Sequence, residues 1–270
     1  MLDTSKFSLQ TTVVTVLVLA TTQIRAEDAK AEPSKSTWPR IQKKTYDFKE
    51  AAKEMEYGLF VPSTYDKTKK TPLIVALHGL SSNPQQIMRY PGFTDLAEKH
   101  GYIVTAPMGY NSQGWYGQKP PFVRKPDPDN LFELSEQDVM NVLEIVRKDY
   151  SIDADRIYLM GHSMGGGGTI HLGLKHPDLW AALAPIAPAI FHRPAELEKI
   201  KQVPIVLVQG DDDKLVRVGL VRPWAEKMKE LKMTYEYIEV PGGGHVDVAV
   251  KNLPKIFEFF NAHKKPAKTG

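Results

Sequence analysis

The most informative stretch of this 270-residue chain is residues 156–166, which read Arg156-Ile157-Tyr158-Leu159-Met160-Gly161-His162-Ser163-Met164-Gly165-Gly166. Its apolar part is typical of a buried strand, and the glycines on either side of the serine leave room for a sharp turn into a helix. Such a turn exposes the Ser163 hydroxyl at the carboxyl end of a sheet, beside the next backbone N–H. Because a serine hydroxyl is a weak nucleophile, the turn predicts catalysis only where a base and an acid also follow.

A candidate base follows later in the chain. Of the eight histidines, only His245 and His263 lie well beyond the next strong strand-like segment, and His263 sits in a Lys-rich tail. His245 comes after the glycine-rich loop 241–244, which directly follows the strand-like run 235–240. A catalytic histidine needs a loop of this kind to hold its ring over the serine, so we predict His245 as the general base.

The candidate acid ends the strand-like segment before that one. Residues 204–210 form this apolar segment, and it runs directly into Asp211, Asp212 and Asp213. In doubly wound sheets that carry a serine on such a strand-to-helix turn, the order along the chain is serine, acid, histidine, and the three aspartates fall at the right place in that order. On position alone, each of the three could orient the histidine.

Three further stretches carry a resemblance to a known family. They read Tyr-Gly-Leu-Phe-Val-Pro at 57–62, Pro-Leu-Ile-Val-Ala-Leu-His-Gly at 72–79 and Ile-Asp-Ala-Asp-Arg at 152–156, the last leading into the serine turn. With them the chain resembles the α/β-hydrolase superfamily from about residue 45 to 262. Within that superfamily it is similar to small secreted esterases of the polyhydroxybutyrate-depolymerase and feruloyl-esterase-like group, and to prolyl-oligopeptidase-like catalytic domains.

This resemblance implies an α/β-hydrolase fold, with a mostly parallel sheet of about eight strands and helices on both faces. Strand-like runs that alternate with helical patterns indicate the same architecture. The spacing Gly-x-x-Asp-x-x-Val at 210–216 resembles the usual acid loop of the fold. The resemblance therefore favours Asp213 as the acid, with Asp211 and Asp212 as alternatives.

The run 161–169 is also similar to polyester-cleaving cutinases. The rest of the chain departs from their pattern, because the strand end His78-Gly79 differs and there is no cysteine for a terminal disulfide. Polyester cleavage is therefore a minor hypothesis.

The composition is that of an ordinary globular chain. It is 42% hydrophobic and 25% charged, with a net charge of +3 and basic residues interleaved with acidic ones. These values favour one catalytic domain at 44–263 and argue against a nucleic-acid partner. No metal-ligand spacing and no glycine-rich nucleotide motif is present, so we expect no metal and no cofactor. The expected partner is a small-molecule or polymeric ester substrate.

The N-terminal segment has the pattern of a secretory signal. Lys6 provides a positive start, residues 11–20 are apolar, and Ile24-Arg25-Ala26 is a plausible cleavage site. We predict a signal peptide at 1–26 and a disordered linker at 27–43, whose composition is rich in Ala, Glu, Lys, Pro and Ser. The protein is then expected to be secreted or periplasmic, without stable membrane insertion after cleavage; an uncleaved anchor is the alternative.

The middle of the chain holds one strong helical pattern and one long loop. Apolar residues recur at helical spacing over 139–150, and Ser135 and Asp138 are placed like a capping box. The segment 109–130 is rich in glycine and proline and carries Trp115 and Tyr116. We expect this segment to lie over the active site. It is therefore predicted to be a lid or substrate platform, with these two side chains as its apolar wall. The alternative is an aromatic cluster that only packs the loop down.

The remaining site predictions concern the groups around the serine. Backbone N–H groups of Leu80 and Met164 are expected to form the oxyanion hole. His162 could contact the acyl group, or it could be a wall residue. The pattern as a whole predicts a serine hydrolase of carboxylic esters. A prolyl-oligopeptidase-like peptidase and a non-catalytic binding protein on the same scaffold are the alternatives.

Overall fold

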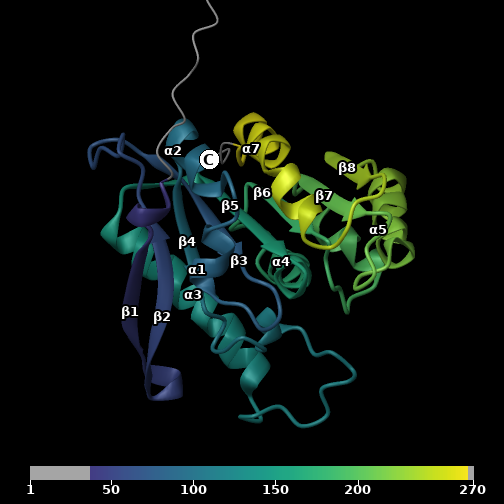
Figure 1. Ribbon diagram of the computed structural model, residues 1–270, viewed down its shortest axis with the longest axis horizontal. Helices are drawn as coiled ribbons and strands as arrows, with labels where there is room; N and C mark the ends of the chain where they lie inside the picture. Colours follow the sequence, from purple (N-terminus) through teal and green to yellow (C-terminus); the bar gives the residue numbers. More distant parts are fainter. Residues whose placement is uncertain (1–36, 267–270) are drawn as a thin grey trace, which may run out of the picture. The chain divides into compact units, whose positions relative to one another are not determined.

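A sheet of eight strands organises the part of the chain that this computed structural model describes, residues 37–266 (Figure 1). The strand order is β1-β2-β4-β3-β5-β6-β7-β8. The pairs β1–β2 and β2–β4 are antiparallel, and all other neighbouring pairs are parallel. The strands are β1 (Gln42–Phe48), β2 (Lys53–Phe60), β3 (Thr71–Leu77), β4 (Ile103–Pro107), β5 (Ile152–His162), β6 (Ala182–Ile186), β7 (Ile205–Gly210) and β8 (Tyr235–Val240).

Helices cover both faces of this sheet, as the resemblance implied. One hydrophobic core lies between the sheet and α3, α4 and α5, and a second core lies between the opposite face and α1, α2, α6 and α7. The α-helices are α1 (Pro84–Met88), α2 (Phe93–His100), α3 (Leu131–Asp149), α4 (Met164–Lys175), α5 (Val218–Glu230), α6 (Asp247–Lys251) and α7 (Leu253–Ala262). Short 3-10 helices are η1 (Trp38–Arg40), η2 (Lys49–Ala51), η3 (Trp115–Gly117) and η4 (Pro194–Ile200). Within residues 37–266, no helix has the length and apolar character needed to cross a membrane.

The central strands are apolar throughout because both of their faces are covered. In β5, Ile157 and Leu159 point into one core, whereas Tyr158 and Met160 point into the other. Successive side chains of a strand point to opposite faces, so a strand between two helical layers needs an unbroken apolar run. The edge strand β1 differs: most of its residues are exposed, and it lies with β2 at one end of the sheet (Figure 1).

The folded part begins before residue 44. β1 starts at Gln42, and Thr37 donates hydrogen bonds from its N–H and its hydroxyl to Asp95 in α2, at 3.0 and 2.9 Å. Residues 37–43 therefore pack on the domain, although their composition had placed them in a linker. The predicted signal peptide at 1–26 and the rest of the predicted linker lie outside the described residues.

The predicted capping box is wrong. α3 begins at Leu131, so Ser135 and Asp138 lie inside the helix and both are buried. Their side chains hold the long loop after β4. The Ser135 hydroxyl accepts the N–H of Tyr116 at 3.0 Å, and the Asp138 carboxylate accepts the N–H of Gly109 at 2.6 Å. The two polar residues that resembled a helix start therefore anchor the loop after β4 instead.

The C-terminal helical region is broken before Pro254. α6 ends at Lys251 and α7 begins at Leu253, with the proline in its first turn, where a missing N–H costs no intrahelical hydrogen bond.

We expect Asp138→Ala to lower the free energy of unfolding by about 3 kcal/mol, because buried donors lose their acceptor. These donors are the N–H of Gly109 and the Tyr46 hydroxyl, which lies 2.6 Å from the carboxylate. Asp138→Asn is the matched control. It keeps the shape and one carbonyl oxygen, so it should lose less than half as much. Urea denaturation measures both, and an Ala variant as stable as the wild type would contradict the anchoring role.

Candidate active site

Ser163 occupies the junction between β5 and α4. Its backbone has φ 60° and ψ −116°, a strained conformation for a residue that is not glycine. The turn is held by main-chain hydrogen bonds: the Ser163 N–H donates to the Ile186 carbonyl at 2.9 Å, and the Ser163 carbonyl accepts from Gly167 and Ala189, each at 3.0 Å. The serine thus stands at the carboxyl end of the central strand, as the sequence predicted.

The two glycines beside the serine are needed for close packing. A Cβ atom at Gly161 would lie 2.2 Å from the Gly165 carbonyl oxygen, and one at Gly165 would lie 2.1 Å from the Leu77 oxygen. Both distances are far below van der Waals contact, and the obstructing atoms belong to the backbone. The start of α4 can therefore lie directly against the end of β3 only without side chains at these positions.

His245 lies against Asp213. The His245 Nδ1 is 2.7 Å from a carboxylate oxygen of Asp213, whose side chain is completely buried. The other carboxylate oxygen accepts the N–H groups of Leu215 and Val216 at 2.8 and 2.9 Å. Burial raises the pKa of Asp213, but the hydrogen bonds from His245, Val216 and Leu215 outweigh it and leave that pKa below its ordinary value. The carboxylate is therefore ionised at neutral pH.

The two alternative acids point elsewhere. Asp212 is exposed and pairs with the ammonium of Lys214, and the Asp211 carboxylate accepts the N–H of Gly242 at 2.7 Å. Of the three aspartates, the structure brings Asp213 to the histidine.

Ser163 and His245 line one cavity of about 830 Å³. Because the Nδ1 of His245 is bonded to Asp213, its Nε2 is the ring nitrogen available to a serine hydroxyl. Leu80 also lines this cavity, and the neighbouring Gly79 packs against the Ser163 side chain. Among the described residues, the N–H groups of Leu80 and Met164 donate to no protein carbonyl, so both remain available as oxyanion donors.

His162 matches the alternative of a wall residue. It lines the cavity but is only 4% exposed, and both ring nitrogens have partners. The Nε2 lies 2.8 Å from the His245 carbonyl, and the Nδ1 lies 2.7 Å from the Tyr90 hydroxyl. Burial, reinforced by the nearby His245, lowers the pKa of His162 to about 4, so the ring is neutral at neutral pH. It then donates to the carbonyl and accepts from Tyr90, which ties down the loop that carries His245.

Trp115 and Tyr116, the predicted walls of the loop after β4, lie in different places. Trp115 lines the cavity, whereas Tyr116 is completely buried and is not among the lining residues. The Tyr116 hydroxyl donates to the His78 carbonyl at 3.2 Å, beneath the loop. A buried phenol hydroxyl needs a hydrogen-bond partner, and for Tyr116 this partner is the backbone carbonyl of His78. Tyr116 therefore packs the loop down and does not face substrate.

A chain of polar groups supports another wall of the cavity. His192 lines it, and its Nε2 lies 2.9 Å from the Nδ1 of His171, whose Nε2 is 3.2 Å from the Glu136 carboxylate. The other ring nitrogen of His192 is 3.1 Å from Glu196. Across residues 37–266, no group of three or more His, Cys, Asp or Glu side chains is arranged to hold a metal ion.

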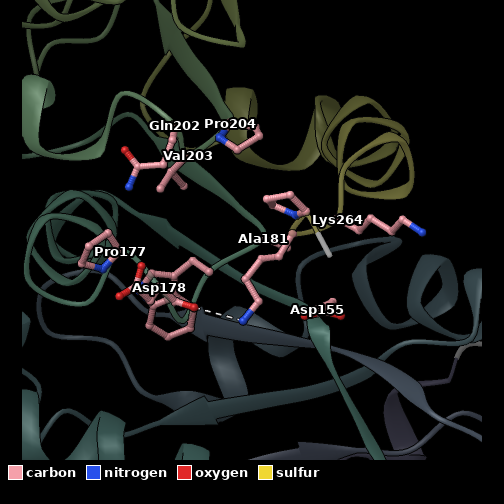
Figure 2. Close-up of a pocket in the computed structure, with 11 residues that line it drawn as sticks. Asp155, Pro177, Asp178, Ala181, Gln202, Val203, Pro204 and Lys264 are labelled. Carbon is pink, nitrogen blue, oxygen red and sulfur yellow. Dashed lines mark hydrogen bonds between the residues drawn. The ribbon is translucent and has the colours of Figure 1, made fainter. Parts of the chain in front are cut away.

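A second cavity, of about 430 Å³, lies at the amino ends of the strands (Figure 2). Asp155 of β5, Ala181 before β6 and Pro204 before β7 line it, together with Lys264 near the C-terminus. It contains neither a serine nor a histidine. Ser163 and His245 line the cavity at the opposite, carboxyl edge of the sheet.

An eight-stranded, mostly parallel sheet with helices on both faces and a serine on the turn after its central strand defines an α/β-hydrolase. The model of the Esterase family, described as "Putative esterase", matches residues 49–251. The chain belongs to this family.

Similar proteins agree with this assignment. The chain is 28% identical over 144 residues to "Putative esterase NocK" of Nocardia uniformis subsp. tsuyamanensis, covering 53% of this chain and 40% of that protein. It is 26% identical over 155 residues to S-formylglutathione hydrolase of Bos taurus, covering 53% and 55%. The matches thus span about half of the chain and about half or less of these relatives.

Solved structures extend the likeness over most of the domain. A thermostable esterase aligns with a TM-score of 0.64 at 26% identity, covering 84% of this chain and 64% of that one. A ferulic acid esterase from Anaeromyces mucronatus, solved in complex with ferulic acid, aligns with a TM-score of 0.65 at 21% identity, covering 83% and 90%. At 21% identity, the likeness to the ferulic acid esterase concerns the fold alone.

Tyr90 is the site residue that sequence reasoning missed. It lies in the short connection between α1 and α2. No spacing relative to His162 points to it, because 72 residues separate the two.

We expect Tyr90→Phe to lower kcat by roughly fivefold with little change in KM, because one buried hydrogen bond behind the His245 loop is lost. Tyr102→Phe is the matched control. It removes one hydroxyl bond, 2.8 Å to Asn261, on the second core and away from the cavity. Both variants should lose similar thermal stability, but only the first should lose turnover of a p-nitrophenyl ester. Equal turnover in the two variants would contradict the positioning role.

Proposed function

We propose that this protein hydrolyses carboxylic esters through an acyl-enzyme intermediate, with Ser163 as nucleophile, His245 as general base and Asp213 as the orienting acid. The observation that carries the proposal is the 2.7 Å contact of the His245 Nδ1 with a buried carboxylate, in a ring that shares a cavity with Ser163. Membership of the Esterase family supports it.

In the first half of the reaction, the Ser163 oxygen attacks the carbonyl carbon of the ester while the His245 Nε2 takes the hydroxyl proton. The tetrahedral oxyanion accepts hydrogen bonds from the N–H groups of Met164 and Leu80. His245 then returns the proton to the departing alkoxide, and the alcohol leaves. Water repeats the sequence on the acyl-serine, releasing the acid and restoring the serine.

The electrostatics of the site favour this proton transfer. The Asp213 carboxylate is ionised, since its hydrogen-bond donors hold its pKa below the ordinary value. A fixed negative charge beside Nδ1 selects the tautomer that leaves Nε2 free and stabilises the imidazolium formed during attack. The Met164 N–H lies at the N-terminus of α4, whose dipole also favours the developing oxyanion.

Two other functions compete with ester hydrolysis. A peptidase of the prolyl-oligopeptidase type would use the same three residues, but the relatives of this chain are described as a putative esterase and as an S-formylglutathione hydrolase. A non-catalytic binding protein would have no need for a strained serine opposite a paired histidine. We further propose that the protein is exported, on the strength of the charged, then apolar pattern of residues 1–26.

The function is tested by labelling and by turnover. A fluorophosphonate probe should label the wild type and not Ser163→Ala, and short p-nitrophenyl esters should be cleaved faster than peptide anilides. Ser163→Ala should lower kcat by about a millionfold, as in other serine hydrolases. Faster cleavage of anilides would favour the peptidase, and a folded wild type that resists labelling would favour the binding protein.

The identity of the acid is tested by paired amide substitutions. We expect Asp213→Asn to lower kcat by about 10⁴-fold, because the amide removes the charge and favours the wrong histidine tautomer. Asp212→Asn is the matched control at an exposed position two residues from Lys214. It should change kcat by less than about twofold, since surface ion pairs contribute little. A severe loss in the control with a mild loss at 213 would reverse the assignment.

A further inference from the structure

The exposed large hydrophobic side chains of the described chain gather at one place. Residues 37–266 contain seven of them, and six line the cavity that holds Ser163. The six are Leu80, Phe122, Phe191, Leu215, Leu220 and Val246. The seventh, Trp38, lies in η1 and not in this lining. Isolated exposed hydrophobic residues are ordinary on protein surfaces, but a contiguous set around a cavity marks a binding surface. We refer to the six as the apolar rim.

The rim is built by separate segments that meet at one edge of the sheet. Leu80 follows β3, Phe122 follows β4, Phe191 follows β6, and Val246 follows β8. The remaining two, Leu215 and Leu220, lie after β7 and in the first turn of α5. Five loops thus each place an apolar side chain around the same mouth. Leu215 and Leu220 are 76% and 68% exposed, so folding buries little of their surface.

Three aromatic rings connect the rim with the interior of the cavity. The rings of Phe122 and Phe191 lie 5.6 and 5.3 Å from that of Trp115, edge to face, and 5.6 Å from one another. Trp115 is buried, whereas Phe122 is 62% exposed. This aromatic trio forms a continuous wall from the surface to the interior.

The lining of this cavity offers no charged side chain to pair with a substrate. None of the residues that line this cavity is Asp, Glu, Lys or Arg. Its polar side chains are Ser82, Tyr90, His162, Ser163, His192 and His245. Of these, Ser163 and His245 belong to the proposed reaction, and His162 and Tyr90 are bonded to each other. A dissolved ester with ionised groups, or one rich in hydroxyls, would lose hydration here without regaining ionic or multiple hydrogen bonds.

We infer that the natural substrate is a neutral, water-insoluble ester, and that the apolar rim docks the enzyme on the surface of its aggregated form. The inference rests on the proposed ester hydrolysis. Because the rim surrounds the mouth above Ser163, whatever covers it must deliver an ester to that serine. An apolar aggregate removes all six side chains from water at once, which a single small dissolved ester cannot do. The rim thus acts before catalysis, by concentrating the enzyme where the substrate is.

A kinetic experiment tests the docking with one chemical bond in two physical states. Glyceryl tributyrate is supplied below and above its solubility limit, and butyrate release is titrated. The wild-type rate should rise by at least about fivefold above the value extrapolated from the dissolved range, because adsorption adds apolar contacts. A rate that saturates in the dissolved range and stays level beyond the limit would overturn the proposal.

Adsorption is measured separately, without turnover. Ser163→Ala should settle with tributyrate droplets on centrifugation, and adding Phe122→Ser and Leu220→Ser should lower its adsorption constant by about tenfold. Trp38→Ser, which removes the exposed hydrophobic residue outside the rim, is the matched control and should adsorb like its parent. Circular dichroism checks that each variant is folded. Leu215 is the most exposed of the six rim residues, and Leu215→Ser should also lower the adsorption constant.

Failure of docking and failure of the proposed function give different results. In active enzyme, the rim variants should lose at least about fivefold more rate on droplets than on dissolved tributyrate. Equal losses in both states, or adsorption unaffected by the rim substitutions, would overturn the docking while leaving ester hydrolysis intact. No hydrolysis of either state would overturn the proposed function, and adsorption of the Ser163→Ala protein would still report on the rim.

Discussion

The close approach of α4 to the end of β3 is the constraint on which the site depends. Gly165 lies so near the Leu77 carbonyl that no Cβ atom fits between them, and Gly161 is restricted in the same way by Gly165. This packing forces the strained backbone of Ser163, which β6 then holds through the Ile186 carbonyl. The serine is presented by the two strands beside its own, so its hydroxyl position is set by the core of the sheet.

The histidine is held in the same cavity by contacts of a different kind. Its loop follows β8 at the edge of the sheet, and two side chains contact His245 itself: Asp213 on the ring and His162 on the carbonyl. Because His162 precedes Ser163 and is backed by Tyr90, the serine turn itself anchors His245. A neutral His162 suits this position, since a second charged imidazolium beside His245 would oppose protonation of the catalytic ring.

Around the cavity, polar and apolar side chains occupy different places. The Asp213 carboxylate is buried beneath the histidine, and two of the loops that carry rim side chains, those after β4 and β6, are anchored by Asp138 and by the chain from His192 to Glu136. Polar groups thus hold the loops from inside, while apolar groups face outward around the mouth. On an ordinary protein surface, polar groups face outward. Here the exposed hydrophobic residues of the rim gather at the edge of the sheet where Ser163 lies.

Local pattern was enough to predict the sheet, its helical layers, and the chain order of Ser163, an aspartate and His245, because periodicity and glycine spacing are short-range properties. It failed where partners are distant in sequence. Ser135 and Asp138 resembled a helix start but serve a loop some twenty to thirty residues earlier, and Tyr90 gave no signal. The direction of Tyr116, the choice among three adjacent aspartates and the gathering of six hydrophobic residues at one mouth all follow from folding. They depend on which carboxyl ends of strands become neighbours, and no local pattern encodes that adjacency.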